Sequence, residues 1–465
     1  MQLSPQDAQF LYLETDNYLT HVTTVMILDP DAKGVGFEEL RRHFEVRLAA
    51  SPIFHQHLVR VAGDLDYPYW ADDPHFDLEY HVHQVAAPSS GDWSSFRTWL
   101  SDLHSRPLDM RRPLWELHIV EGLRLRESRF EGSLAVVFKV HHTAMDGGAL
   151  ARFFITVTDA SAESPPPTAP PASSPPSPRP SEVAQLRRAA THGVLMPARM
   201  GREVLRSAPV IAAAVREQLR PRARNQAPRR EIPVTRFERD DSPHRTFDAT
   251  RFPLAELNAF RALAPGSTLN DVVLTLVGGA LRRYLARHGE LPEVPLVAWV
   301  PVNARRRGSD EGGNQLAAMT ASLFTTVEDP VERLRAVHDG MRRSKSGRSG
   351  ASARLLTAMT QNIPAFGQPI IRRVLIESPL RARLCNLFVS NVRGPSEPRF
   401  LAGARVTHLF GAAPLGLGMG LFIGTPSYAG EMTFSITSNR ETMPDVGDLI
   451  QDLEEARNEL RRGAR

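Results

Sequence analysis

The stretch LAVVFKVHHTAMDGGAL, from Leu134 to Leu150, joins an apolar run to two adjacent histidines, an aspartate and a pair of glycines. The β-branched and aromatic residues before His141 predict a β-strand. Asp146 precedes GGALARFF, and an aspartate at such a position caps a helix by accepting hydrogen bonds from its first turn. A strand that feeds a helix through a short loop is typical of α/β and α+β folds.

The two histidines are separated by the alternation of side chains along a strand. His142 continues the apolar face that includes Val140, whereas His141 shares the opposite face with Lys139. A histidine that ends a strand and faces an apolar cavity stays neutral near its reference pKa of about 6.5 and can accept a proton. We interpret His142 as a candidate general base, with a structural histidine as the alternative, and His141 as mainly architectural.

Asp146 and the glycines after it have structural interpretations. Asp146 is predicted to be a helix N-cap, and a further ion pair with a distant arginine would be compatible with that role. Gly147 leaves room for close approach of backbone or substrate. We predict no metal site, because adjacent strand residues point apart and no further Cys or His cluster completes one. Covalent catalysis by Cys385 is not indicated, because no base neighbours it in the sequence.

Length and composition indicate an ordinary soluble protein of roughly two domains. The 465 residues include one cysteine, so no internal disulfide points to an oxidising compartment, and the cytosol is the default expectation. The first sixteen residues lack the basic and apolar regions of a secretory signal. The uncharged run Val406–Gly430 is broken by glycines and a proline, and it is interpreted as strand and loop rather than as a membrane span.

A linker divides the chain. Nine of the twenty residues 161–180 are proline, which favours an extended spacer. Residues 181–230 hold eleven arginines against three glutamates, a local net charge of +8, interleaved with apolar clusters as in helices at anionic lipid surfaces; a solvated helical face is the alternative. Nucleic acid is a weaker candidate because stacking aromatic residues are absent there. We predict an N-terminal domain over 1–160, a crossover over 161–243 and a C-terminal domain over 244–465.

Helices and strands interleave in both predicted domains. The apolar spacing predicts helices over 37–50 and over 272–289, the second ending at Gly289. Strands are predicted over HVTTVMIL and LWELHIV in the first half and over PLVAWVPV, NLFVSNV and MTFSIT in the second. We therefore expect an α/β or α+β pair of sandwich domains, without a predicted strand order.

Several motifs together carry a resemblance to a known family. They are RPLWELHIVEGL at 112–123, HHTAMDG at 141–147, STLNDVVLTLVGGALRRYL at 267–285, PVNAR at 301–305 and SNVRGP at 390–395. The heptapeptide HHTAMDG matches the HHxxxDG signature of the CoA-dependent acyltransferase superfamily. In order and spacing the set resembles the bacterial wax ester synthase/diacylglycerol acyltransferase family. Arg393 stands at a position where that family usually has proline.

The resemblance implies two chloramphenicol-acetyltransferase-like domains with the active site in a tunnel between them. It implies that His142 takes the proton of an alcohol hydroxyl, whose oxygen attacks the thioester of a long-chain acyl-CoA, and that no cofactor is required. The implied acceptors are diacylglycerol, giving triacylglycerol, or a long-chain alcohol, giving a wax ester. We expect a cytoplasmic protein held peripherally at the inner membrane face or at lipid droplets.

The resemblance also assigns further residues to the site. Asn270 would help to stabilise the oxyanion. The residues implied to border the substrate are Pro113, Leu114, Trp115, Asp271, Asn391 and Gly394. Each has a structural alternative: Trp115 as a core residue, Asp271 as part of a capping box with Thr268, and Asn391 and Gly394 as a turn.

Two other functions stay open from the sequence. A condensation-type acyltransferase would take its acyl group from a carrier protein and use the same base. A lipid-binding or droplet-coating protein without turnover would tolerate loss of the base, and the intact HHTAMDG motif argues against it.

Overall fold

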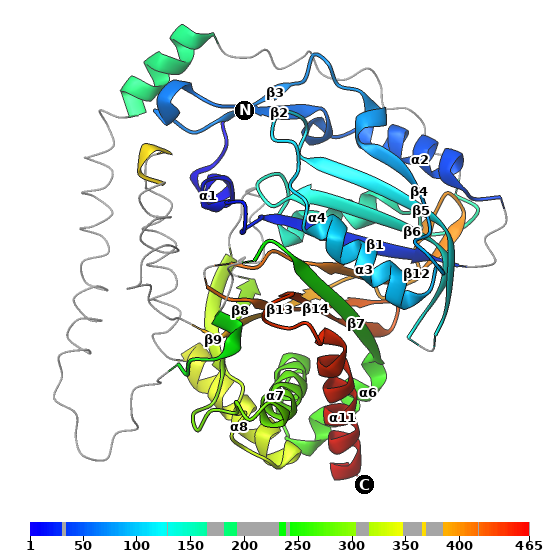
Figure 1. The fold of residues 1–465 in the computed structure, drawn as a ribbon, viewed down its shortest axis with the longest axis vertical. Helices are drawn as coiled ribbons and strands as arrows, with labels where there is room; N and C mark the ends of the chain where they lie inside the picture. The colour runs from blue at the N-terminus through cyan, green and yellow to red at the C-terminus, as the bar shows by residue number, and fades with distance from the viewer. Residues whose placement is uncertain are drawn as a thin grey trace.

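Two six-stranded sheets lie one above the other in the computed structural model (Figure 1). The structure describes residues 1–29, 34–127, 129–164, 181–192, 232–238, 242–303, 316–346, 365–368, 385–416 and 418–464. Most of the proline-rich spacer, most of the basic segment and the last two residues of the PVNAR motif lie outside these residues. Both α-helices and sheets are present, so the predicted mixed α/β class is confirmed.

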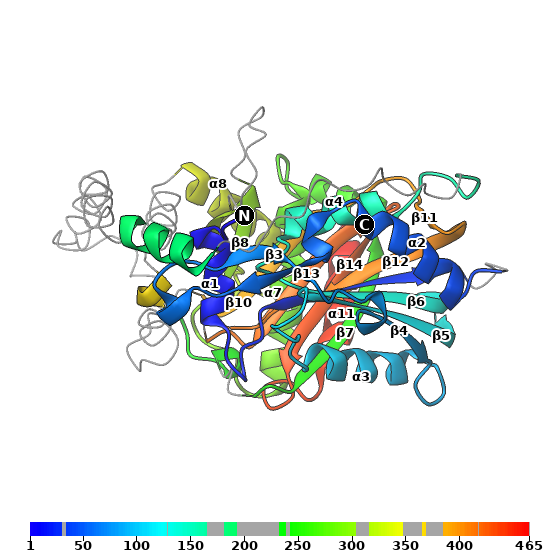
Figure 2. The ribbon, with the colours of Figure 1, turned by 90° about the horizontal axis from the view of Figure 1, so that it is seen from above.

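The upper sheet is formed mainly by the N-terminal half. Its strands, in spatial order, are β11 (Phe400–Leu401), β12 (Ala404–Ala412), β1 (His21–Leu28), β6 (Phe130–His141), β5 (Trp115–Glu127) and β4 (Val82–Ala86). The helices of this half are α1 (Pro5–Leu13), α2 (Phe37–Ala49), α3 (Trp93–His104) and α4 (Gly147–Val157). A two-stranded sheet of β2 (Gln56–Val59) and β3 (Tyr69–Asp72) lies beside α1 (Figure 2).

The lower sheet belongs to the C-terminal half. Its order is β7 (Arg245–Pro253), β14 (Glu431–Asn439), β13 (Leu421–Tyr428), β10 (Leu387–Arg393), β8 (Val297–Asn303) and β9 (Leu316–Ser322). The helices of this half are α6 (Leu254–Ala259), α7 (Leu269–Arg287), α8 (Pro330–Ser346) and α11 (Val446–Gly463). The last three cover the face of this sheet that points away from the upper sheet (Figure 1).

The local signals in the sequence explain most of these elements. In α2 the apolar side chains Leu40, Phe44 and Leu48 are buried, as the helical spacing predicts. Helix α7 begins with a capping box between Thr268 and Asp271. It ends at Arg287, two residues before Gly289, whose φ of +68° is a conformation that glycine adopts without strain.

The sheets do not follow the predicted domain boundaries completely. Strands β11 and β12, from the expected C-terminal domain 244–465, complete the N-terminal sheet. Strand β12 pairs antiparallel with β1, with Thr23 opposite Ala412. Residues 400–412 of the predicted C-terminal domain thus belong to the N-terminal sheet, and the domain boundaries themselves stay a prediction. The physical reason is that β1 would otherwise be an edge strand with unpaired backbone groups.

Candidate active site

Strand β6 carries the histidine pair through the centre of the N-terminal sheet. It pairs with β1 on one side and β5 on the other, and His141 lies opposite His21. Val136, Phe138 and Val140 pack against α2 and α4, whereas Val137 packs towards α3. Both faces of the strand are therefore buried.

His141 is held by hydrogen bonds to four neighbours, three of them through its ring. Its Nδ1 accepts from the backbone N–H of Thr143 at 3.1 Å, so in the neutral ring the proton lies on Nε2. Nε2 contacts the Glu14 carboxylate and lies 3.0 Å from the Thr20 hydroxyl. The backbone N–H of His141 donates to the Leu114 carbonyl at 3.0 Å. This saturated, buried environment fits an architectural role.

His142 follows directly after β6 and lies in a different environment. Its backbone N–H donates to the Thr20 carbonyl at 2.9 Å, and its ring stacks on Phe10 with centroids 3.9 Å apart. The ring is partly buried, and within the described chain its buried Nδ1 has no hydrogen-bond partner. Burial lowers the pKa of His142 to about 4, although the Asp146 charge and the residue's own backbone raise it. The ring is therefore neutral at pH 7, and burial moves its pKa below the reference value of about 6.5.

The loop from His141 to Gly147 is shaped by local hydrogen bonds. The N–H groups of Ala144 and Met145 donate to the His141 carbonyl at 2.9 and 3.3 Å. Asp146 caps α4 by accepting from the Ala149 N–H at 2.5 Å, so the N-cap predicted from the sequence is present. No described arginine forms an ion pair with Asp146, so the further pairing stays a prediction. A Cβ added at Gly147 would have no atom within 4 Å, so space is open beside the loop.

The segment Pro113–Trp115 leads into β5 beside the end of β6, where Trp115 lies opposite Val140, and it is buried. Trp115 is 2% exposed, donates from Nε1 to the Phe54 carbonyl at 2.9 Å, and stacks on His81 with centroids 4.6 Å apart. Leu114 supplies the carbonyl that holds the His141 backbone. These contacts favour the core alternative for Trp115 and leave its substrate contact a prediction.

Asn270 and Asp271 lie in the first turn of α7, on the side of the C-terminal sheet that α7, α8 and α11 cover (Figure 1). Asp271 is 1% exposed, and its Oδ2 accepts from the Thr268 N–H at 2.8 Å and lies 3.1 Å from His338 Nδ1. These contacts favour the capping role for Asp271. No described hydrogen bond or ion pair joins either residue to the histidine pair, so the oxyanion role of Asn270 stays a prediction.

Asn391 and Gly394 lie at the end of β10, a strand of the C-terminal sheet that contacts α4. The Gly394 N–H donates to the Ser427 carbonyl at 3.0 Å, and a Cβ at Gly394 would lie 2.3 Å from that oxygen. The backbones of residues 394 and 427 therefore approach so closely that only glycine fits at position 394. Arg393 ends the strand with its side chain exposed.

Phe10, Glu14 and Thr20 contact the histidine pair but carry no role in the sequence prediction. They lie more than 120 residues from His141 along the chain, and the Thr20 hydroxyl also bonds the Glu14 carboxylate at 3.1 Å. No local pattern in the sequence marks a pairing between residues so far apart. The sequence offers one signal for the contact with His141, which is the acidic residue Glu14 directly after α1.

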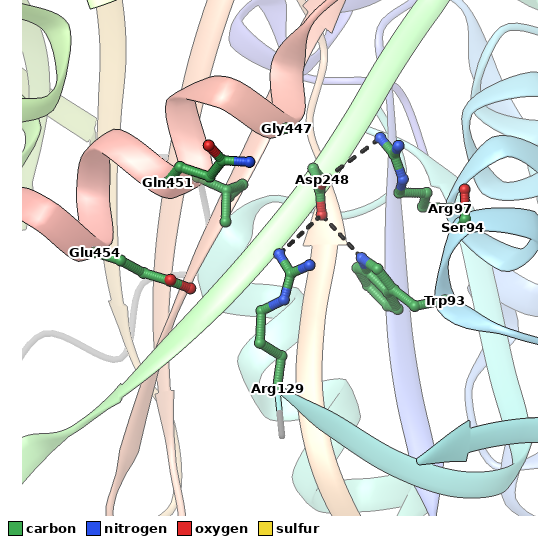
Figure 3. A pocket seen from close by; sticks show the side chains of 9 residues that line it. Trp93, Ser94, Arg97, Arg129, Asp248, Gly447, Gln451 and Glu454 are labelled. Carbon is green, nitrogen blue, oxygen red and sulfur yellow. Dashed lines mark hydrogen bonds and ion pairs between the residues drawn. The ribbon is translucent and has the colours of Figure 1, made fainter. Parts of the chain in front are cut away.

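A polar cavity of about 360 Å³ lies elsewhere between the halves of the molecule, between α3, β7 and α11 (Figure 3). Buried Asp248 of β7 accepts from Trp93 Nε1 at 2.9 Å and forms ion pairs with Arg97 and Arg129 at 3.4 and 3.9 Å. Arg129 precedes the first residue of β6, whereas His141 is the last. This cavity is therefore at the far end of β6 from the histidine pair. In the part of the chain that the structure describes, no group of three or more metal-ligating side chains converges.

Two family models match the sequence. One, described as the wax ester synthase/diacylglycerol acyltransferase catalytic domain, covers residues 3–273, and the WS/DGAT C-terminal domain covers residues 312–461. The chain belongs to the wax ester synthase/diacylglycerol acyltransferase family. Members of this family carry out acyl transfer, and the chain is an acyltransferase of this type.

Individual relatives agree with the assignment to the wax ester synthase/diacylglycerol acyltransferase family. A Mycobacterium tuberculosis protein, provisionally named a diacylglycerol O-acyltransferase, is 31% identical over 99% of this chain and 90% of its own. The solved wax ester synthase/diacylglycerol acyltransferase of Marinobacter aquaeolei VT8 superposes over the whole of both chains with a TM-score of 0.71 and 25% identity. Polyketide synthase associated protein 5 of Mycobacterium tuberculosis shares the fold alone, with a TM-score of 0.54 and 14% identity over 98% of this chain and 96% of that one.

Proposed function

We propose that this acyltransferase moves a long-chain acyl group from acyl-CoA to the hydroxyl of diacylglycerol or of a long-chain alcohol. The observation that carries the proposal is the His142 ring, which is neutral at pH 7 and stacked on Phe10 beside an open space at Gly147. A neutral imidazole in such a place can accept a proton from a bound hydroxyl. The family membership supports the lipid substrates.

The proposed reaction needs no covalent enzyme intermediate and no cofactor. Because Nδ1 of His142 is buried, we assign the proton transfer to its other ring nitrogen, Nε2. As the proton passes to Nε2, the hydroxyl oxygen forms a bond to the thioester carbon. The tetrahedral intermediate then expels the CoA thiolate, which takes the proton from His142, so that an ester and free CoA leave the site.

Turnover assays test the donor, the acceptor and the base together. We expect ester formation from labelled palmitoyl-CoA with dioleoylglycerol, and a second assay with hexadecanol measures the alternative acceptor. His142→Ala should lower kcat by about 10² to 10⁴ with little change in acyl-CoA affinity. A folded His142→Ala protein with full activity would contradict the base. Palmitoyl groups accepted only from a carrier protein would favour the condensation-type donor, and ester formation by neither route would favour a lipid-binding protein.

Peripheral binding to anionic membranes or lipid droplets at the cytoplasmic side is part of the proposal. Among the described residues, no helix is both long and apolar enough to cross a membrane. The net charge of +8 over residues 181–230 and the lipid substrates favour attraction to anionic lipid. We expect flotation with anionic liposomes that weakens as salt is raised. A variant with the arginines of 181–230 replaced by glutamine should float less, and equal flotation of both proteins would contradict the prediction.

A further inference from the structure

The segment between α1 and β1, which we call the histidine-holding loop (Glu14–Thr20), contacts both histidines through its two ends. Glu14 and the Thr20 hydroxyl bind His141 Nε2, and the Thr20 carbonyl accepts from the His142 backbone. The position of the His142 ring therefore depends on the shape of this loop. The middle of the loop takes no part in these hydrogen bonds. Two of its residues, Asn17 and Tyr18, instead lie against residues of the C-terminal half.

Arg245, the first residue of β7 in the C-terminal sheet, binds the middle of the histidine-holding loop. Its side chain is buried, and one terminal nitrogen donates to the Asn17 carbonyl at 2.7 Å while the other donates to the Ser242 carbonyl at 2.5 Å. Its backbone N–H donates to Ser105 Oγ at the C-terminal end of α3 at 2.9 Å. A planar guanidinium that bridges two carbonyls fixes both position and direction.

Gly416, in the connection from β12 to β13, lies against Tyr18, the loop residue that follows Asn17. A Cβ built on Gly416 would lie 1.8 Å from a carbon of the Tyr18 ring, so the ring occupies the place of a side chain. The connection itself is held at both ends. The Ala413 carbonyl lies 3.1 Å from His104 Nε2, and the Gly420 carbonyl accepts from the Ser438 hydroxyl at 2.6 Å.

We propose that Arg245 and Gly416 are positioning residues for acyl transfer: from the C-terminal half they fix Asn17 and Tyr18, and thereby the loop that holds His141 and His142. The inference rests on the proposed function of His142. Neither residue touches substrate. The chain of contacts joins the C-terminal sheet to the histidine pair, so the catalytic geometry is complete only when both halves are docked.

A compensating pair of substitutions tests the contact at Gly416. Gly416→Ala should displace the Tyr18 ring and lower kcat by about 10²-fold with little change in KM for acyl-CoA, because a displacement near 1 Å costs about this much. Gly416→Ala combined with Tyr18→Ala removes the clash with the ring but keeps the backbone strain of alanine at a φ of +157°, so it should recover about tenfold of the loss and not all of it. Gly289→Ala is the control, since Gly289 also has a positive φ, +68°, and its added Cβ would meet no atom within 4 Å. Full activity of Gly416→Ala would overturn the proposal, as would a double variant no better than the single one.

A second pair of variants tests Arg245 and remains informative if an alanine at Gly416 prevents folding. Arg245→Lys keeps one hydrogen bond to a carbonyl and should lose less kcat than Arg245→Met, which keeps none. Asp248→Asn is the matched control, because it lies in the same strand and weakens contacts with Trp93 and Arg97 of the N-terminal half, neither of which belongs to the histidine-holding loop. It should lower the melting temperature and leave kcat unchanged. A folded Arg245→Met protein with normal kcat, or an equal loss of kcat in Asp248→Asn, would overturn the proposal.

A measurement without turnover separates this inference from the proposed function. In protein labelled with ¹⁵N-histidine, the ring signals of His141 and His142 should shift in Gly416→Ala and Arg245→Met, while that of His288, which contacts Asp445 in the C-terminal half, stays in place. If the wild-type protein forms no ester, the proposed function fails and these signals still decide the positioning role. Unchanged signals of both histidines in both folded variants would overturn it.

Discussion

The charge state of His142 is set by the residues that bury its ring, because burial lowers its pKa. The sequence places a histidine at the end of an apolar strand, but the Phe10 ring and the unpartnered, buried Nδ1 come from the fold. Burial removes water that would stabilise the imidazolium, and the Asp146 charge only partly opposes this effect. A base with a lowered pKa is always available at neutral pH, although it is intrinsically weaker than an ordinary histidine.

This charge state predicts the pH dependence of ester formation. The rate follows the neutral fraction of His142, which is complete well above its pKa and falls as protons bind. With a pKa of about 4, kcat/KM should be flat between pH 6 and pH 8 and half-maximal only near pH 4. Rates measured within minutes of dilution into each buffer, with recovery at pH 7 as the control, test this. A half-maximum near pH 6.5 would show that the ring is hydrated in the working enzyme.

Gly147 offers a residue-scale test of where substrate lies. An added Cβ would contact no atom within 4 Å, so Gly147→Ala should leave the melting temperature nearly unchanged. If substrate occupies the open space, the same methyl group should raise KM or lower kcat by about tenfold, a cost of about 1.4 kcal/mol. Activity and thermal melting of the purified variant provide the measurement. Unchanged kinetics would place the substrate elsewhere.

At the scale of elements, the sequence predicts the strand bounds and helix caps that depend on residues close together in the chain. Strand β1 has the bounds of the predicted HVTTVMIL segment, and Asp146 and Thr268 cap the helices that their positions indicate. These features follow from side-chain alternation and from capping chemistry, which act over a few residues. The contact of Glu14 with His141 could not be predicted, because it depends on how α1 returns to the end of β6.

The cap of α4 gives a prediction for an element. Asp146→Ala removes the acceptor of the Ala149 N–H and should lower the free energy of unfolding by about 0.5 to 2 kcal/mol. Activity should fall only as far as the loop around His142 loosens, because the capping carboxylate is not the base. Chemical denaturation and kinetics on the same sample separate the two effects, with Asp146→Asn, which can still cap, as the control. Loss of activity in Asp146→Asn without loss of stability would give the charge a direct role.

At the scale of the whole molecule, the crossing of β11 and β12 into the N-terminal sheet is the feature that sequence patterns miss. Alternation predicts a strand near residue 406 but cannot name its partner, and β1 lies about 380 residues away. The same crossing brings Gly416, in the connection that follows β12, close to Tyr18 of the N-terminal half. A chain read as two consecutive domains is in fact joined through a shared sheet.

The buried histidines predict acid sensitivity of the whole protein. Burial is the main cause of a lowered pKa at His21, His43, His55, His81, His83, His104, His142 and His408. Below pH 6.5 these histidines bind protons in the unfolded chain but stay neutral in the folded protein. Their contribution to the free energy of unfolding is therefore complete above that pH and is lost as the pH falls. Raised pKa values at Glu431 and at Asp452, the latter about 6, act in the opposite direction but involve only two groups.

The eight histidines should therefore dominate between pH 7 and pH 5. Each contributes at most about 1.4 kcal/mol per pH unit, and partial exposure of several rings reduces the sum. We expect the free energy of unfolding to fall steadily as the pH is lowered from 7 to 5, because each of these pKa values is lowered in the folded state. Urea denaturation at pH 7, 6 and 5 measures the slope, and His142→Gln should reduce it because glutamine does not titrate. A constant free energy of unfolding across this range would mean that water reaches these rings in the folded protein.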